Sequence, residues 1–304
     1  MKFLTLFSGS SGLNTHVDKT RVKFDPETGV SDLTVGVNVT HDDTGLLGRR
    51  KGRELLIAGD FHSIFAWEDE CYIAEGGNLY RLGSDLATLT GVRDGMSGNR
   101  IAYVSTPLGI YYQNGFDIGI LRQGVSYLWG KSVYVGPETL RHLTGPPVGL
   151  HIELSGGYML IARGDVLWWS QPFAYGLYHM AKDYLPFPSR IRMVKAVDGG
   201  VYVSDEKRIY FLAGKNPEEW SLKEKAHGNP ALEWSDECAL VPGETLGLDD
   251  TDALCALWVA TDGACYGTPD GNVESLNNKK ITYPQNINSG AGLLMGKNFI
   301  HSIS

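Results

Sequence analysis

Short hydrophobic runs and polar turns alternate along most of this chain. Between residues 62 and 276 the runs are four to six residues long, rich in Val, Ile, Leu, Tyr and Trp, and separated by turns rich in Gly and Asp. Runs of this length, bounded by turn residues, are typical of β-strands. The pattern therefore predicts an all-β protein.

The hydrophobic runs fall into groups that repeat along the sequence. Each group has about three runs, and the period is roughly 40 residues. Five groups are recognisable, and they begin near residues 62, 100, 148, 191 and 253. A period of this length with several strands in each unit favours a β-propeller. Two packed β-sandwiches are the competing layout.

Strand-like runs also lie at both ends of the chain. Residues 21–24 and 33–40 alternate between apolar and polar side chains, and residues 290–303 make up about half a repeat. A propeller closes without an unpaired edge when one blade is built from both termini. We therefore predict an all-β β-propeller of about six blades, with a last blade composed of N- and C-terminal strands and with short helical insertions.

The domain organisation follows from the same pattern. Residues 1–20 are rich in Ser and Gly and are predicted to form an N-terminal arm, and residues 21–304 are predicted to form a single β-propeller domain. The longest interval between repeats contains an insertion at about 214–250, in which Pro217 is placed to begin a short helix. A second helical piece is predicted at 174–183, because prolines bracket this segment.

Composition fits a globular chain and argues against a nucleic-acid groove binder. The 304 residues are 42% hydrophobic and 20% charged, and the net charge is −8. Proteins that bind in nucleic-acid grooves normally carry a basic surplus. No run approaches the ~18 apolar residues of a membrane-spanning helix, and the N-terminal apolar run is too short for a signal peptide. We expect synthesis in a cytoplasm, with the four cysteines as small, reduced, apolar residues.

Several short motifs match catalytic signatures only in part. Residues 43–45 read Asp-Thr-Gly, but aspartic proteases need two such carboxylates and the chain has no second copy. Residues 290–296 resemble a dinucleotide fingerprint without the surrounding βαβ pattern. Residues 9–12 are one residue short of a nucleophile elbow. Turns and strands explain all three segments better.

The charged and metal-binding residue types form no pattern that specifies a site. An acidic loop contains Asp249, Asp250 and Asp252, but its spacing differs from that of a calcium-binding EF-hand loop. The eight histidines are scattered, with no metal-ligand spacing. The main basic cluster is interpreted as a solvated or partner-facing loop; it consists of Arg49, Arg50, Lys51 and Arg53.

An aromatic segment raises the question of carbohydrate binding. Residues 168–173 and Phe187 have the aromatic character of sugar-stacking sites, although packing between blades is the better interpretation. A glycosidase would also need two carboxylates at a set separation. Asp165, Asp198 and Asp262 are candidates that nothing in the sequence selects. We therefore assign no catalytic, cofactor-binding or metal-ligating residue, and expect a non-enzymatic protein without a cofactor.

A resemblance to a known family is carried by structural motifs. Residues 37–46, followed by Arg-Arg-Lys-Gly at 49–52, resemble the opening segment of certain bacteriophage structural proteins. Residues 62–65 and 79–82 resemble the first blade of those proteins, and segments between 167 and 214 resemble later blades. The likeness covers most of residues 30–215. It implies a virion protein of a tailed phage, similar to propeller-bearing tail, nozzle or hub components.

This resemblance implies a structural role. We expect a symmetric homo-oligomeric ring in the tail or head–tail region of the virion, made in the host cytoplasm and bound to other virion proteins such as a tail adaptor, the portal or tail fibres. An acidic chain suits a conduit that DNA passes during ejection without specific binding, because like charges repel. Two alternatives stay open. One is a propeller that binds or cleaves host polysaccharide, and the other is an intracellular propeller scaffold.

Overall fold

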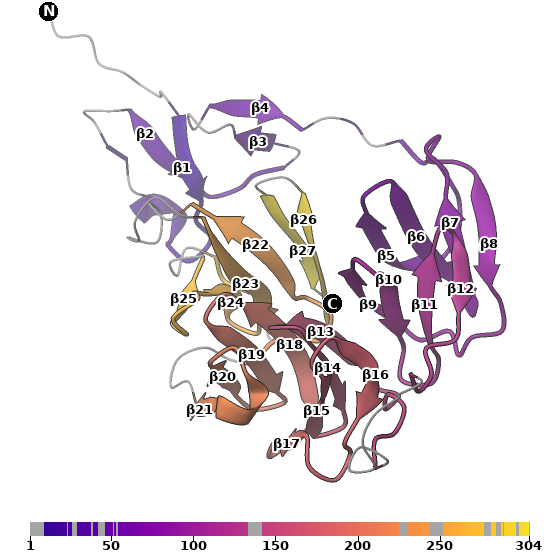
Figure 1. Ribbon diagram of the computed structural model, residues 1–304. Helices are drawn as coiled ribbons and strands as arrows, with labels where there is room; N and C mark the ends of the chain where they lie inside the picture. Colours follow the sequence, from indigo (N-terminus) through magenta and orange to yellow (C-terminus); the bar gives the residue numbers. More distant parts are fainter. Residues whose placement is uncertain are drawn as a thin grey trace, which may run out of the picture.

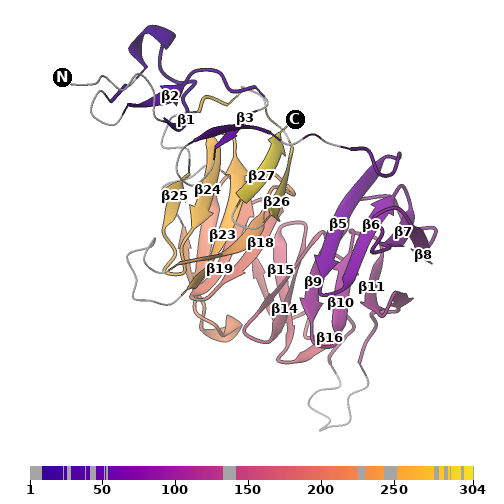
Figure 2. The same cartoon turned by 90° about the horizontal axis from the view of Figure 1, so that it is seen from above.

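The computed structural model describes residues 9–22, 24–25, 29–37, 39–41, 46–50, 52, 54–132, 142–224, 230–242, 252–276, 281–283, 287, 289–295 and 298–303. Five antiparallel sheets of four or five strands follow one another along this part of the chain. Figures 1 and 2 show them side by side around a common centre. The chain is an all-β β-propeller.

The five complete blades are numbered here in chain order. Blade 1 contains β5 (Phe61–Trp67), β6 (Glu70–Glu75), β7 (Asn78–Leu82) and β8 (Leu89–Arg93). Blade 2 contains β9 (Ala102–Thr106), β10 (Gly109–Gln113), β11 (Ile118–Arg122) and β12 (Val125–Tyr127). Blade 3 contains β13 (His151–Ser155), β14 (Tyr158–Arg163), β15 (Val166–Gln171), β16 (Ala174–Tyr178) and β17 (Tyr184–Pro186). Blade 4 contains β18 (Ile191–Val197), β19 (Gly200–Asp205), β20 (Ile209–Ala213) and β21 (Ser221–Glu224). Blade 5 contains β22 (Glu237–Val241), β23 (Ala253–Ala260), β24 (Gly263–Gly267) and β25 (Val273–Ser275).

Each blade is a series of hairpins whose first strand lies nearest the centre. The first strand of blade 3, β13, contacts the first strands of its neighbours, β9 and β18, and β18 also contacts β22. Later strands of each blade lie progressively farther out, as Figure 1 shows. Side chains on the first strands of different blades are thereby brought together at the centre.

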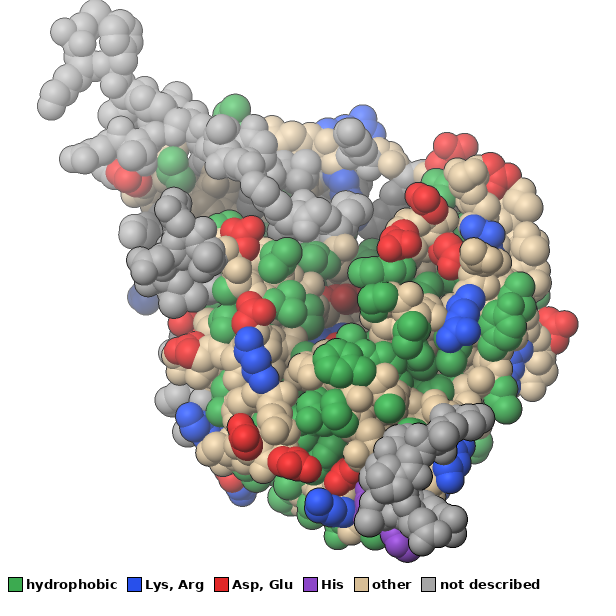
Figure 3. Space-filling view, in the orientation of Figure 1, with side chains coloured by type: hydrophobic (Ala, Val, Ile, Leu, Met, Phe, Trp, Pro, Cys, Tyr) green, Lys and Arg blue, Asp and Glu red, His purple; other side chains and the backbone are tan. Residues whose placement is uncertain are grey.

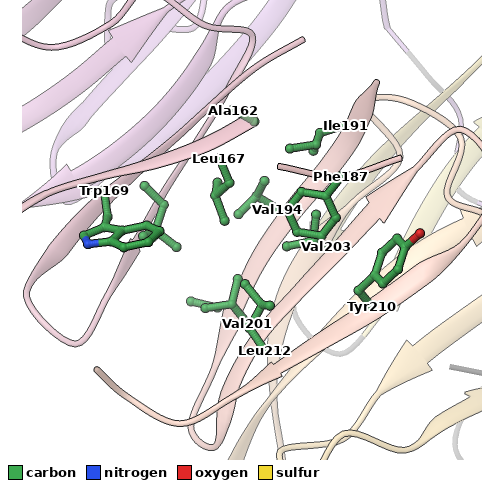
Figure 4. Close-up of a cluster of buried hydrophobic side chains, with 12 residues drawn as sticks. Ala162, Leu167, Trp169, Phe187, Ile191, Val194, Val201, Val203, Tyr210 and Leu212 are labelled. Carbon is green, nitrogen blue, oxygen red and sulfur yellow. The ribbon is translucent and has the colours of Figure 1, made fainter. Parts of the chain in front are cut away.

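The hydrophobic core consists of layers between consecutive blades. The layer between blades 3 and 4 contains Leu167 and Trp169 from β15, facing Val201, Val203 and Leu212 of blade 4 (Figure 4). Comparable layers separate blades 1 and 2, blades 2 and 3, and blades 4 and 5. Blade 4 is therefore covered on both faces, and every residue of its strand β19 is buried. This explains why its strands are nearly continuous hydrophobic runs instead of alternating ones.

A two-stranded sheet follows blade 5 at the C-terminal end. It consists of β26 (Gly290–Met295) and β27 (Asn298–Ile303), which form an antiparallel hairpin. Phe299 and Ile303 of this hairpin pack against Leu232 and Val259 beside blade 5. Within the described residues β26 and β27 pair only with each other. The structure thus has five complete blades instead of about six, and the described N-terminal strands do not join β26 and β27 in a composite blade.

The N-terminal strands form two small sheets outside the blades. Strand β1 (Gly9–Leu13) pairs in parallel with β2 (Val30–Leu33), and β3 (Val39–His41) pairs antiparallel with β4 (Leu47–Arg49). A short 3-10 helix, η1 (Lys19–Arg21), lies between β1 and β2. The predicted irregular arm at 1–20 therefore contains a strand.

Of the two predicted helical segments, the structure has one and replaces the other with a strand. A short 3-10 helix, η3 (Pro217–Glu219), begins at the predicted proline, with Asn216 as its N-cap. The rest of the described part of 214–250 is mainly blade: β21 and β22 lie in it. The helix predicted at 174–183 is wrong, because this segment contains β16, whose Tyr175 and Tyr178 are buried in the layer between blades 2 and 3.

Candidate functional site

The inner strands of the propeller enclose a cavity of about 450 Å³. Residues of β5, β9, β13, β18 and β26 line it, together with the segment that leads into β22. In Figure 3 hydrophobic side chains gather around a hollow near the middle of the face shown. The polar side chains that line the cavity include Lys195, Asp236, Glu237, Arg100 and His151. This cavity is the candidate functional site.

Lys195 holds two carboxylates at the centre of the molecule. Its Nζ atom lies 3.6 Å from Oε2 of Glu153 and 3.4 Å from Oδ2 of Asp236. The three side chains come from blade 3, blade 4 and the entry to blade 5, and all are less than one fifth exposed. The cluster of Lys195, Glu153 and Asp236, here called the central triad, therefore links three blades.

The electrostatics of the central triad keep the ammonium charged. Burial alone would lower the pKa of Lys195, but the carboxylates of Asp236 and Glu153 outweigh it and raise this pKa well above its usual value. Burial raises the pKa of Glu153 and of the neighbouring Glu237. A lysine that is fixed in its charged form by two acids is neither a nucleophile nor a base. The triad is suited to cross-linking the blades.

A second ionic network lies beside the central triad. Nε2 of His151 is 3.4 Å from Oε1 of Glu233, and Nη2 of Arg190 is 3.0 Å from Oε2 of the same carboxylate. Arg190 also approaches Glu206 of the β19–β20 turn at 3.5 Å. Burial alone would raise the pKa of Glu233, but the His151 side chain and the charge of Arg190 outweigh it and lower this pKa. The network joins blades 3 and 4 to the segment before blade 5.

The segment before blade 5 has a strained backbone, and the side chains of Trp234 and Asp236 line the cavity. Trp234 has a φ of 69°, which residues other than glycine seldom adopt. The buried Ser235 hydroxyl donates to the carbonyl of Leu232 at 2.6 Å and accepts from the amide of Val259 at 3.1 Å. Gly292 of β26 donates its amide hydrogen to the carbonyl of Trp234. The Trp234 ring then lies 5.0 Å from the His151 ring, both at the cavity wall.

A serine–histidine pair lies on the blade 1 side of the cavity. Ser63 occupies a bulge in β5, with a φ of 56°, and its Oγ accepts the amide hydrogen of Ile101 at 2.8 Å. Nδ1 of His62 is 2.8 Å from the same Oγ, and Nε2 of His62 is 3.3 Å from the carbonyl oxygen of Gly76. The hydroxyl is thus engaged by a backbone amide and by its own neighbour. This arrangement ties blade 1 to the start of blade 2.

One hydrogen bond connects the start of blade 2 to the C-terminal hairpin. Nη1 of Arg100 donates to the carbonyl oxygen of Gly290 at 3.0 Å. Gly290 is the first residue of β26, so this bond crosses the space between the first complete blades and the last strands of the chain. It is a polar link, in contrast to the buried layers that join the other blades.

The structure separates the carboxylates suggested by the sequence. Asp165, Asp198 and Asp262 lie in hairpin turns of three different blades and do not line the cavity. The Asp198 carboxylate instead accepts the amide hydrogen of Leu254 at 2.8 Å. Asp43, Asp249 and Asp250 lie outside the described residues. No group of described His, Cys, Asp and Glu residues is arranged to hold a metal ion.

The other sequence candidates have structural places. Trp169 packs edge-on against Trp220, and Phe187 packs edge-on against Tyr210, so both belong to the layer between blades 3 and 4 as the packing interpretation predicted. Phe173, by contrast, is exposed. The four cysteines are all free, and Cys255 and Cys265 are buried. Of the basic cluster, Arg49 and Arg50 are exposed, whereas Lys51 and Arg53 lie outside the described residues.

Sequence reasoning missed the charged groups of the cavity. Glu153 and Lys195 each interrupt the first hydrophobic run of a repeat, in the sequences His-Ile-Glu-Leu-Ser and Ile-Arg-Met-Val-Lys-Ala-Val. A charge inside a buried strand needs a partner. The first strands of a propeller meet at the centre. The opposite charges of Glu153 and Lys195 in these strands therefore could have predicted their contact.

Comparisons with known proteins identify the fold alone. No family model and no curated protein matches the chain. Among solved structures, the extracellular domain of a putative hybrid two-component system from B. thetaiotaomicron is similar to it, with a TM-score of 0.50, 13% identity, 81% of this chain covered and 31% of that one. The Neurospora crassa Pan2 WD40 domain has a TM-score of 0.48 and 10% identity, covering 76% of this chain and 68% of that one. The WD40 β-propeller domain of Doa1 has a TM-score of 0.44 and 12% identity, covering 71% and 67%. The chain spans about a third of the length of the bacterial extracellular domain.

Proposed function

We propose that this chain is a non-enzymatic structural component of a tailed-phage virion, which assembles as a ring in the tail or head–tail region and binds neighbouring virion proteins. The resemblance of residues 30–215 to phage structural proteins suggests the setting. The structural observation that carries the proposal is a set of exposed apolar side chains at one end of the blades.

These side chains lie in turns that share one face of the propeller. In an antiparallel blade the turns after the first and third strands lie at the same end. Leu108 follows β9, Leu86 follows β7 and Phe173 follows β15, and their side chains are 54%, 51% and 75% exposed. Trp67, at the end of β5, is exposed at the same end. Apolar side chains gathered on one face favour protein–protein contact.

The interior of the propeller supports a structural role as well. Most of the charged groups at the cavity are ion-paired, in the central triad and in the Glu233 network. Groups paired in this way hold blades together, whereas a catalytic group must be free to exchange protons or bonds with a substrate. Passage of DNA would use the lumen of the assembled ring, not the cavity of about 450 Å³ within one chain.

The test is to locate the chain in purified particles. Mass spectrometry of phage particles separated from the lysate is expected to find the chain at many copies per particle, and imaging is expected to place it in a ring at the tail or the head–tail junction. A chain confined to the infected cell and absent from particles contradicts the proposal. Leu108→Lys and Phe173→Lys are expected to reduce incorporation, while the matched surface change Lys182→Glu leaves it unchanged.

The cavity favours one alternative, a protein that binds or cleaves host polysaccharide. Trp234 and Tyr103 at the wall, with the carboxylates of Asp236 and Glu237, have the residue types of a sugar site. Binding of purified host polysaccharide that is lost in Trp234→Ala and kept in Leu108→Ala supports the alternative. Release of reducing ends that is lost in Asp236→Asn supports cleavage.

A further inference from the structure

The central cavity has an apolar wall on the side of blade 1. Phe61 and Phe65 of β5 and Ile73 of β6 line it there. The Phe65 ring stacks on the ring of Tyr103 in β9, with the two ring centroids 4.9 Å apart. The cavity volume of about 450 Å³ lies within the range of small-molecule sites. The size and this wall suit a ligand with an apolar body.

The start of β22 directs a carboxylate toward the cavity. The Cys238 thiol donates to the carbonyl oxygen of Ala196 at 3.5 Å, so the Cys238 side chain faces blade 4. Successive side chains of a strand point to opposite faces. Glu237 therefore points away from blade 4, and it lines the cavity. Within the described residues, the Glu237 side chain forms neither an ion pair nor a hydrogen bond.

Negative charge is in excess around Glu237. Three carboxylates act on the ammonium of Lys195, and they belong to Asp236, Glu153 and Glu237. The ammonium is in contact with the first two, so Glu237 has no cation at ion-pair distance. Burial and the other two carboxylates outweigh Lys195 and raise the pKa of Glu237. A buried charge without a partner is costly, and a bound cation would remove that cost.

His151 supplies a second acceptor at the cavity. Its side chain is only 6% exposed and lines the cavity beside Trp234. Its Nε2 atom is enclosed and faces Oε1 of Glu233, so Nδ1 is the ring nitrogen left for a ligand. When the proton lies on Nε2, toward the Glu233 carboxylate, Nδ1 accepts hydrogen bonds. The Trp234 ring adds a π face that attracts cations.

We propose that the central cavity binds a small organic cation, with an ammonium or guanidinium group near Glu237 and His151 and an apolar body against the phenylalanines of blade 1. The N–H donors of such a group match the two acceptors, and its charge offsets the excess of carboxylates. Arg100, the other cation at the wall, donates to the carbonyl oxygen of Gly290 and forms no ion pair with Glu237. The inference does not rest on the proposed function.

The first experiment is a calorimetric titration of the purified full-length chain at pH 7 with ligands of equal chain length. Hexylamine and hexylguanidine are cations, hexanol is neutral and hexanoate is an anion. We expect saturable binding of at least one of the cations, about tenfold or more tighter than that of hexanol or hexanoate. Equal binding of all four ligands, or no saturable binding of either cation, overturns the proposal.

A peptide ligand distinguishes a free small molecule from a basic side chain of another protein. The tripeptide Gly-Lys-Gly carries an ammonium group on a side chain attached to a peptide backbone. We expect it to bind more weakly than hexylamine, because the walls of the cavity must also exclude or accommodate the backbone. Tighter binding of the tripeptide would assign the cavity to a protein partner and overturn the proposal of a small molecule.

The second experiment uses Glu237→Gln, which keeps the shape of the side chain and removes its charge. We expect this variant to bind the cation about tenfold more weakly or worse, and to be at least as stable as the original chain, because the carboxylate has no cation partner to lose. Glu219→Gln is the matched control: it removes an exposed carboxylate of η3 and leaves binding unchanged. Lower stability with unchanged binding would give Glu237 a structural role and overturn the proposal. Since the chain is tested alone, absence from virions would overturn the proposed function without changing this result.

Discussion

Among single residues, Lys195 is expected to matter most for stability because it is the shared cation of two carboxylates from different blades. Lys195→Met removes the charge and leaves Glu153 and Asp236 facing each other at the cavity wall. Breaking a buried ion pair from one side costs about 3 kcal/mol, so we expect the free energy of unfolding to fall by about that amount. Chemical denaturation measures it.

The control and the pH dependence separate charge from packing. Lys182→Met, at an exposed position, is expected to change the free energy of unfolding by less than about 0.5 kcal/mol. The loss in free energy of unfolding caused by Lys195→Met is expected to be smaller near pH 5, because protonation removes the unpaired negative charges. Burial already raises the pKa of Glu153, which favours this protonation. Equal losses at neutral and acidic pH would show that packing, not charge, is responsible.

The pKa of Glu233 is shifted in the opposite direction to that of Glu153. Its pKa is lower in the folded chain than the usual 4.5, because His151 and Arg190 outweigh the effect of burial. A carboxyl whose pKa falls on folding stabilises the protein above its unfolded pKa, and this contribution is lost as the pH falls through the folded value. Glu233→Gln is therefore expected to cost about 1–2 kcal/mol at pH 7 and little below about pH 3. Denaturation at both pH values tests this, with the exposed Glu54→Gln as control; a constant difference contradicts it.

At the residue scale, the sequence predicted aromatic packing better than it predicted charge. Trp169 and Phe187 were expected to pack between blades because aromatic side chains remove large apolar areas from water wherever blades meet, and they do. Lys195 and Glu153 lie about 40 residues apart in sequence, and only the ring arrangement brings them within 3.6 Å. To predict such a contact from the sequence, one must know which strand of each blade is innermost.

At the scale of elements, contacts between turns limit how closely neighbouring blades can approach each other. Gly199, in the β18–β19 turn, lies against the β24–β25 turn: a Cβ at this position would overlap the carbonyl oxygen of Pro269. The obstructing atom belongs to the backbone, so the turn itself must move. Gly199→Ala is expected to destabilise the chain by about 1–3 kcal/mol, as overpacked sites do.

Gly91→Ala is the matched control for that change. Gly91 lies in β8, a Cβ added to it would meet no atom within 4 Å, and its φ is not positive. Alanine lowers the entropy of the unfolded chain, so this variant is expected to be as stable as the original or slightly more stable, by about 0.5 kcal/mol. Thermal unfolding of both variants measures the difference. Equal effects at the two positions contradict the role assigned to the contact between turns.

The elements were predictable where the hydrophobic pattern was strong and were missed at the edges. The inner three strands of blades 1 to 4 follow from runs such as residues 200–204. The outer strands β8, β12 and β21 were missed, because one side of each faces solvent and their sequences lack a clear apolar run. The fifth group of runs begins one strand later than blade 5, since β22 has few buried residues.

At the scale of the whole molecule, stability should vary around the ring. Blade 4 has a buried layer on each face, whereas blade 1 has one against blade 2 and only partly buried residues on its other face. Stability that rests on neighbouring layers is approximately a sum of local contacts, as in other repeat architectures. The sequence pattern at the two ends of the chain predicted closure by a composite blade, and in the described residues β26 and β27 pair only with each other.

Hydrogen exchange measures this gradient directly. Amides of β19, β20 and β23 are expected to exchange most slowly, and those of β5 to β8 and β27 faster, because regions with fewer buried contacts open at lower free energy. Uniform protection across all blades would contradict this gradient.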